Sequence, residues 1–484
     1  MMKSHSMAGR RHLYDRNWRS LLRGLIIAGL IVATPILGIA TVWGRIDPTL
    51  IAAAVLVAVV VAAGLRWPPS PELSLEAMIL AAVLINFFTI PTGTQSRIVV
   101  SLVIALYLVG GWLIGPLITK QRLRLLPSPI NRPLILFVLI NAVAFVWASL
   151  MRDPLIWVPN SWYVIQGAAF LVNVLLPLLA LFVANTVKDV RWLRIYAWTI
   201  IGLGLFVVVS ELLRLPFNIL YFNGTRGLFA MWVVVLAYAI ALTDRTIGFW
   251  LRVALLAIVA AWIVNNFLFN TLWLSGWVPI VVACGMVTWF RSKKLALLAL
   301  LLVLIYIAWN AGPLYQRVFV ANAEEGSLSR LDIWQMSLTH VANHPLFGMG
   351  PAGYAVYNMT YHPQDARSTH NNLFDVLAQN GIIGFAAFMW LFAAFAYVGI
   401  LARRLLAGKR NFEEAFAIAA LGGIFGAAIG MMLGDWVLPF AYNQTISGFD
   451  NALFTWFMLG CLVALYSHER TARGDVSGAD EEVA

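Results

Sequence analysis

His370 stands where a long polar segment, residues 312–371, gives way to an apolar run. An imidazole with a pKa of about 6.5 accepts a proton from a hydroxyl group at neutral pH, so His370 is a candidate general base. Asn371, the next residue, is placed to hold the imidazole or to bind a substrate. A histidine that only caps the following helix is the alternative, and the residue types leave both interpretations open.

Three arginines are candidates for binding an anion: Arg226, Arg317 and Arg330. Arg226 follows an interrupted apolar stretch. Arg330 opens a helical pattern, where the positive end of the helix dipole favours a negative group. A guanidinium binds phosphate or carboxylate through two parallel hydrogen bonds. Single arginines at helix ends also anchor proteins to lipid head groups, which is the alternative for all three.

The polar segment does not have the spacing of a metal site. His340 and His344 are four residues apart, but no H-E-x-x-H or D-x-D pattern accompanies them. The acids of the segment are scattered: Glu324, Glu325, Asp332 and Asp365. We therefore predict no metal and no cofactor, which leaves arginines to neutralise a leaving anion.

The rest of the chain has a composition suited to lipid. Of its 484 residues, 61% are hydrophobic and 11% are charged, whereas soluble domains are about a quarter charged. Fourteen apolar runs, most of a length that crosses a hydrocarbon core of about 30 Å, predict an all-α polytopic membrane protein. The runs are 21–43, 48–65, 75–90, 97–118, 132–150, 162–186, 191–213, 227–243, 249–267, 272–290, 295–311, 372–402, 413–433 and 450–467. The third is short and the twelfth long, as a re-entrant segment and a partly interfacial helix would be, so we expect twelve to fourteen transmembrane helices.

The positive residues predict the orientation. Alternate connections and the basic N-terminal tail hold 25 of the 33 lysines and arginines, and such residues are kept on the cytoplasmic side. We therefore expect a multi-pass protein of the cytoplasmic (inner) membrane with both termini cytoplasmic and segment 312–371 outside. These loops and anionic lipids account for the net charge of +11, so nucleic acid is not an expected partner. The other eight positive residues are all arginines: Arg45, Arg97, Arg152, Arg214, Arg226, Arg317, Arg330 and Arg367.

Five regions follow from this pattern. They are N-terminal helices 1–213, central helices 214–311 with an outer broken segment 214–226, the large outer loop 312–371, C-terminal helices 372–467 and a disordered tail 468–484. Within the loop, Ser329 precedes a helical pattern with Leu331, Trp334, Leu338 and Val341 on one face, and Pro345 ends it. Gly348 and Gly350 follow in a turn, where glycine lets the backbone approach a substrate closely.

With these residues identified, the sequence resembles the O-antigen ligase and O-antigen polymerase superfamily. Residues 329–354, SRLDIWQMSLTHVANHPLFGMGPAGY, are similar to that family's Arg-x-x-x-Trp helix and the His-Pro-Leu-x-Gly-x-Gly turn that follows it. His370, Asn371, Gly381 and Gly384 fit the ligase-type pattern H-[NSQ]-x9-G-x-x-[GTY]. The resemblance covers about residues 220–400.

The resemblance implies a GT-C-like membrane glycosyltransferase of lipopolysaccharide or polysaccharide biosynthesis. Such an enzyme moves a glycan from undecaprenyl diphosphate to a hydroxyl of a glycan or lipid acceptor, on the outer face of the cytoplasmic membrane. Arg330, with Arg226 or Arg317, would bind the diphosphate, and His370 would orient or deprotonate the acceptor. Gly348, Gly350 and Asn371 would contact substrate.

The sequence departs from the family pattern at one position, and two alternative functions stay open. Many relatives carry a Ser-Arg-Gly element before the loop, whereas this chain has Leu274-Ser275-Gly276-Trp277 and lacks the arginine. Either Arg226 or Arg317 supplies that charge, or the donor is held differently. The motif favours a ligase over a polymerase that joins repeat units. A flippase or transporter is the alternative from another class, although the few polar residues in the spans suit helix packing.

Overall fold

The computed structural model describes residues 70–85, 89–91, 97–214, 227–269, 274–316, 330–363, 368–442, 444 and 446–474. Predicted spans 21–43 and 48–65 lie outside the described residues. So do residues 215–226 of the broken segment, which include Arg226, and the part of the outer loop that contains Arg317.

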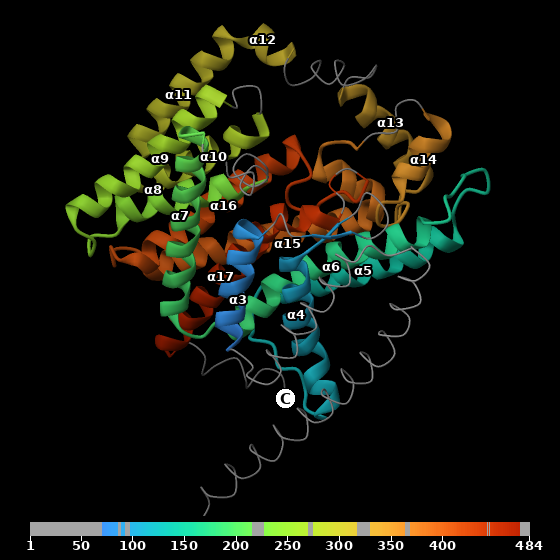
Figure 1. Ribbon diagram of the computed structural model, residues 1–484, viewed down its shortest axis with the longest axis horizontal. Helices are drawn as coiled ribbons and strands as arrows, with labels where there is room; N and C mark the ends of the chain where they lie inside the picture. Colours follow the sequence, from blue (N-terminus) through green and yellow to red (C-terminus); the bar gives the residue numbers. More distant parts are fainter. Residues whose placement is uncertain are drawn as a thin grey trace, which may run out of the picture.

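The described residues form a bundle of helices, shown in Figure 1. Its helices before the outer loop are α3 (Pro71–Leu84), α4 (Val100–Ile118), α5 (Asn131–Leu150), α6 (Trp162–Thr186), α7 (Val190–Leu212), α8 (Phe229–Thr243), α9 (Phe249–Phe269), α10 (Leu274–Arg291) and α11 (Lys293–Trp309). In the outer loop lie α12 (Ala311–Tyr315), α13 (Arg330–Asn343) and α14 (Tyr354–Tyr361), and after it α15 (Asn372–Leu406), α16 (Phe412–Leu433), η4 (Ile446–Gly448) and α17 (Phe449–Ala472). The prediction of an all-α membrane protein is confirmed.

Eight of the described helices are long and apolar enough to cross a membrane, namely α4, α5, α6, α7, α9, α15, α16 and α17 together with η4. Helix α8 is apolar but shorter. Each of the twelve predicted spans that fall on described residues overlaps a helix, and α6 has the predicted bounds. The total of twelve to fourteen spans stays a prediction, because the first two lie outside the described residues.

The third predicted span, 75–90, was wrong at its end. Helix α3 stops at Leu84, and a short antiparallel hairpin follows, in which β1 (Thr89–Pro91) pairs with β2 (Arg97–Val99). Ile85, the C-cap of α3, has already left the helical conformation, with a φ of −125° and a ψ of 22°. With 14 residues, α3 is about 21 Å long and shorter than a hydrocarbon core.

Helix α8 forms the centre of the bundle. Nearly all of its side chains are buried, including Trp232 and Val233, against α7, α9, α10 and α16. Glycines let α16 approach α10 closely: a Cβ at Gly422 would lie 2.8 Å from Ala283 O, and one at Gly426 would lie 2.7 Å from Pro279 O. This is the small-residue packing by which membrane helices associate.

Helix α15 has two parts separated by Gly381, whose φ of 64° and ψ of −171° are available in practice to glycine alone. The break leaves backbone groups without helical partners, and the turn after α13 supplies them. The bonds are Met349 N–H to Ala378 O (2.9 Å), Gly350 N–H to Gln379 O (2.9 Å), Ile382 N–H to Pro345 O (2.8 Å) and Ile383 N–H to Leu346 O (3.4 Å). Residues 345–350 are therefore inserted into the hydrogen-bond ladder of α15.

The prediction that the long twelfth span is partly interfacial stays a prediction, although the polar residues at its start are not exposed. Asp375, Gln379 and Asn380 in the first part of α15 are buried within the protein. Gln379 accepts hydrogen bonds from Asn173 of α6 and from the Ala352 N–H, both at 3.1 Å. The predicted tail also begins later than residue 468, because α17 continues to Ala472.

Candidate functional site

A tight turn, residues 368–371, connects the outer loop to α15 and carries the histidine motif. His370 has a φ of 49°, an uncommon conformation for a residue with a side chain, and its N–H donates to Ser368 Oγ at 3.0 Å. Asn371 caps α15 by accepting from the Leu373 N–H at 2.9 Å. Hydrogen bonds therefore hold the backbone of the turn on both sides of His370, and they fix the position from which its side chain extends.

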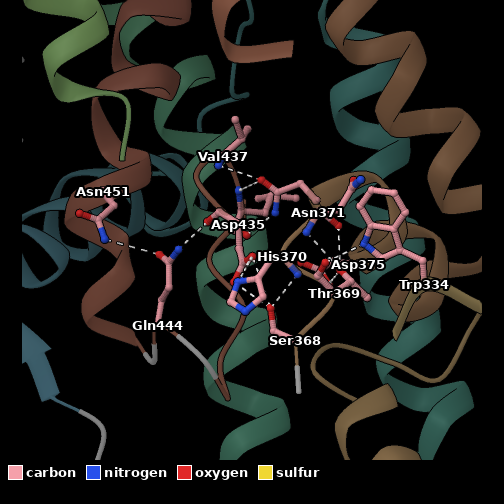
Figure 2. A network of polar contacts seen from close by, with 12 residues as sticks. Trp334, Ser368, Thr369, His370, Asn371, Asp375, Asp435, Val437, Gln444 and Asn451 are labelled. Carbon is pink, nitrogen blue, oxygen red and sulfur yellow. Dashed lines mark hydrogen bonds and ion pairs between the residues drawn. The ribbon is translucent and has the colours of Figure 1, made fainter. Parts of the chain in front are cut away.

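The imidazole faces a buried carboxylate. His370 Nδ1 lies 3.9 Å from Asp435 Oδ1, in the loop after α16. The Asp435 side chain is completely buried, whereas that of His370 is 29% exposed. Ser368 Oγ lies 3.3 Å from Asp435 Oδ2, so one hydroxyl contacts both the carboxylate and the His370 backbone. Figure 2 shows His370, Ser368 and Asp435 together in this arrangement.

The loop that carries Asp435 is fastened to the start of α15. The Asn372 side chain accepts from the Val437 N–H at 2.9 Å and donates to Leu438 O at 2.6 Å. On the other side, Gln444 Nε2 donates to the backbone oxygen of Asp435 at 3.1 Å, and Asn451 lies beyond it in Figure 2. The Asp435 carboxylate that faces His370 is thus positioned by hydrogen bonds to the backbone of the loop that carries it.

A second buried carboxylate, Asp375, lies one turn into α15. Its Oδ1 accepts from Tyr354 Oη at 2.5 Å and from Thr369 Oγ1 at 2.6 Å. Burial, and then the charge of Asp375, raise the pKa of the Tyr354 hydroxyl well above its ordinary value, so this group remains a donor. Because Thr369 precedes His370, these bonds tie the motif to α14, which begins at Tyr354.

Arg330 lies at the first position of α13, one helical turn from a residue that contacts the motif. Trp334 Nε1 donates to Thr369 O at 2.8 Å, and its ring stacks on Phe374 of α15. Residues 330 and 334 are about 6 Å apart along a helix axis. One helical turn therefore separates Arg330 from the contact with the His370 turn, and the binding of an anion by Arg330 and the helix dipole stays a prediction.

The buried face of α13 differs from the predicted one. Ile333, Ser337, His340 and Val341 are buried, whereas Leu331 and Leu338 are exposed. The predicted face was chosen from the spacing of the large apolar side chains along the helix. In the structure, the helix instead packs against α14 and the first part of α15, where ring contacts and hydrogen bonds determine its orientation.

Gly348 and Gly350 contact protein backbone in this structure. A Cβ at Gly348, whose φ is 67°, would lie 2.5 Å from Ala378 O, and one at Gly350 would collide with Ala148 of α5. Their positive φ values and close contacts serve the insertion into α15. A direct contact of these glycines with substrate stays a prediction, as do the roles of Arg226 and Arg317.

Reasoning from the sequence missed Asp435, Asp375 and Tyr354. Asp435 is a single acid in a short polar break, residues 434–449, between two apolar helices, and an acid in such a place was a usable signal. Asp375 lies within a predicted apolar span, 372–402, and was assigned no role. Within the described ranges, no group of three His, Cys, Asp or Glu side chains is arranged to hold a metal ion. The metal-free mechanism itself stays a prediction.

The comparisons with known proteins bear on this same region. Residues 262–389 match the family model described as O-antigen ligase. The match includes α13, the inserted turn, the His370 motif and both sides of the Gly381 break. No curated protein matches the chain.

Proposed function

We propose that the protein is a glycosyltransferase that uses a polyprenyl-linked donor, because residues 262–389 match the O-antigen ligase family model. It moves a glycan from undecaprenyl diphosphate to a hydroxyl of a glycan or lipid acceptor. The reaction takes place on the outer face of the cytoplasmic membrane, where the positive residues of the sequence put loop 312–371.

The observation that carries this proposal is the pairing of His370 with Asp435. A partly exposed imidazole with one nitrogen turned to a buried carboxylate is suited to remove a proton from a hydroxyl. The carboxylate orients the ring and stabilises the imidazolium that forms. The acceptor proton therefore passes to His370 Nε2, while Nδ1 faces Asp435.

The proposed reaction forms one bond at the anomeric carbon and breaks another. The acceptor oxygen forms a bond to the anomeric carbon of the donor glycan as the bond from that carbon to the diphosphate oxygen breaks. The proton of the hydroxyl goes to His370, and the diphosphate leaves with the bonding electrons. Arg330 at the start of α13, with Arg226 or Arg317, binds the diphosphate and neutralises the charge that develops on it.

The test uses the purified full-length protein in lipid nanodiscs, with a lipid-linked glycan extracted from the host strain and an acceptor from the same membrane. His370→Gln removes the base but retains an amide of similar length, and we expect transfer to fall by about 10²- to 10⁴-fold. His468→Gln is the matched control, because His468 is exposed at the far end of α17. Full turnover by the His370 variant would show that the imidazole is not the base.

Asp435→Asn separates positioning from acid–base chemistry. If Asp435 stabilises the imidazolium, the variant lowers the apparent pKa in the pH profile of kcat/KM as well as the rate, whereas a purely structural loss leaves that pKa unchanged.

Two further measurements test the reaction type and the absence of a metal. Glycan on a non-polyprenyl acceptor indicates a ligase, and long lipid-linked chains indicate a polymerase. Activity lost in EDTA and restored by Mg²⁺ would contradict the metal-free mechanism.

A further inference from the structure

The loop between α5 and α6, residues 151–161, is docked on α14. Asp153 N–H donates to Tyr357 Oη at 3.4 Å, Trp157 N–H donates to Thr360 Oγ1 at 3.2 Å, and Tyr361 Oη donates to Asp153 Oδ2 at 2.5 Å. These bonds join segments about two hundred positions apart in the sequence. They hold the loop in one place on the side of the molecule that carries the His370 motif.

Packing between the loop and α14 leaves two large rings exposed. Ile156 and Trp162 are buried and anchor the loop in the same apolar cluster as Tyr354 and Tyr357. Trp157, in contrast, is 65% exposed and Tyr361 is 43% exposed. The Trp157 N–H and the Tyr361 hydroxyl are nevertheless both held by hydrogen bonds. The docked loop thus presents aromatic surface that the fold does not cover.

An ionised carboxylate, Asp153, bonds the Tyr361 hydroxyl and lies in the same loop as Trp157. The Tyr361 hydroxyl and the Leu155 N–H bond to Asp153 and lower the pKa of its carboxyl group. Each carboxylate oxygen has two lone pairs, so Asp153 still has acceptor capacity for a further hydroxyl. Rings that can stack on the C–H face of a sugar, next to a fixed acceptor for its hydroxyls, form a surface suited to a carbohydrate.

Helix α14 connects this surface to the proposed reaction site. Tyr354, its first residue, bonds Asp375 and the Thr369 N–H beside His370, and Tyr361, its last, bonds Asp153. The two ends are about 10 Å apart along the helix axis. A short oligosaccharide covers that distance.

We propose that Asp153, Trp157 and Tyr361 form a glycan subsite that binds sugar units a short distance from the bond being made. The ligand is a neutral or amino-containing oligosaccharide, because the Asp153 charge disfavours a strongly acidic one. This inference rests on the proposed function for its substrate. It assigns a different task, the binding of glycan away from the reacting carbon, to residues outside the His370 motif.

A membrane-anchoring role suits the subsite less well. Anchoring belts combine tryptophan and tyrosine with cations that reach lipid phosphates. Here the Tyr361 hydroxyl bonds the Asp153 carboxylate, whereas the cation of the same loop, Arg152, lies over the buried Trp162 ring at 5.2 Å. Trp309, which is 87% exposed at the end of the poorly covered helix α11, represents an anchoring residue for comparison.

The first experiment measures binding without turnover. The probe is the soluble oligosaccharide released by mild acid from the host's own lipid-linked glycan, titrated into the full-length protein in nanodiscs by calorimetry. Trp157→Ala is expected to raise the Kd by about ten-fold, a loss of about 1.4 kcal/mol, and Trp309→Ala to leave it unchanged. His370→Gln should also leave it unchanged, so binding is judged separately from the proposed chemistry.

A milder pair of variants guards against misfolding. Tyr361→Phe keeps the ring but removes the bond to Asp153, and Tyr163→Phe is its exposed control on α6. We expect the first to weaken oligosaccharide binding by several-fold and the second to have no effect, while both unfold at the temperature of the parent protein. Equal Kd values for the parent, Trp157→Ala and Tyr361→Phe proteins would overturn the subsite.

Transfer assays then identify which substrate occupies the subsite. If it holds the donor glycan, Trp157→Ala raises the KM for a donor with several repeat units more than that for a donor with one. If it holds the acceptor, the KM for the acceptor rises instead. Loss of activity shared by Trp157→Ala and Trp309→Ala, with unchanged oligosaccharide binding, would identify a membrane anchor and reject the subsite.

Discussion

The centre of the bundle and the assembly around the His370 turn, called the outer assembly after the predicted outer loop, are held together in different ways. In the centre, α8, α10 and α16 bury apolar side chains and meet through small residues. In the outer assembly, α13, α14 and the first part of α15 are joined by hydrogen bonds between distant backbone segments and by buried polar side chains. The first region tolerates small shifts of whole helices, and the second depends on particular atoms.

The difference explains where the candidate chemistry lies. A base and its carboxylate need fixed positions, which hydrogen bonds specify better than contacts between apolar surfaces. The His370 turn is bonded to α13 through Trp334 and to α14 through Tyr354, and the loop of Asp435 is bonded to Asn372. We expect changes in the outer assembly to cost more, residue for residue, than changes of similar size in the centre.

The largest effect is expected from Gly381→Ala. The residue has a backbone conformation that L side chains avoid, at a cost of about 1–3 kcal/mol. The new Cβ would also collide with Leu346 O of the inserted turn, which is backbone and cannot rotate away. We expect the variant either to fail to accumulate or to unfold at a much lower temperature, measured by a thermal shift assay in detergent.

Gly167→Ala is the control for this substitution. Gly167 lies in α6 with no atom near the position of a Cβ, so alanine there is expected to be neutral or slightly stabilising. If Gly381→Ala unfolded at the same temperature as Gly167→Ala, residues 345–350 would not be inserted in α15 as described.

A core glycine provides the direct comparison. Gly422→Ala puts a methyl group 2.8 Å from Ala283 O, so α16 and α10 must move apart by a fraction of an ångström. Overpacking of this kind costs about 1–3 kcal/mol. We expect a folded protein with a moderately lower unfolding temperature and nearly normal transfer activity. A loss as large as that of Gly381→Ala would remove the contrast between the two regions.

Tyr354→Phe tests the polar network with a smaller change. The substitution leaves the ring stacked on Phe440 but removes the donor to Asp375 and the acceptor for the Thr369 N–H. Loss of a partner for a buried polar group costs about 1–3 kcal/mol. We expect reduced stability and slower transfer together, because Thr369 precedes His370.

Tyr442→Phe is a suitable control, since its hydroxyl has no hydrogen-bond partner in the described residues. It should retain both stability and activity. Normal transfer by the Tyr354 variant, in a protein that is clearly less stable, would separate the network from the site and make it purely structural.

The sequence was sufficient for the centre of the bundle because apolar length and charge placement are local properties. Helix α6 has the predicted bounds, and α15 and α16 begin within a residue of theirs. Hydrogen bonds between distant segments leave no such pattern. The exposed Leu331 on α13 and the insertion of residues 345–350 into α15 could not be predicted for this reason.

The site was predictable only in part. His370, Asn371 and Gly381 were recognised by spacing, and the structure explains that spacing: nine helical residues separate the cap of α15 from its break. Asp435 is 65 positions from His370, and nothing in its own neighbourhood indicates which side chain it faces. Arg226 and Arg317 lie outside the described residues, so their roles stay predictions.

The smallest expected effect is a dependence of stability on pH that originates in the outer assembly. Burial, followed by repulsion from His362, lowers the pKa of His340, and burial lowers that of His344, although Asp153 acts in the opposite direction. In the unfolded chain both groups titrate at about 6.5. Below about pH 7 these two histidines bind more protons in the unfolded state than in the folded state, so their own contribution to the free energy of unfolding decreases as pH falls from about 7 toward 5.5.

This pH dependence can be assigned by substitution. Thermal unfolding of the protein is compared between pH 7.5 and 5.5 with that of His340→Asn/His344→Asn, which we expect to lose less stability on acidification than the parent, and with that of the His468→Gln control, which we expect to match the parent. Asp153 does not contribute to a change in stability between pH 5.5 and 7.5. The pKa of its carboxyl group is lowered in the folded protein, so the stability that it provides is lost only as pH falls below about 3.8. An equally steep decline in the double variant would place the sensitivity elsewhere, and the outer assembly would then be no more responsive to pH than the centre of the bundle.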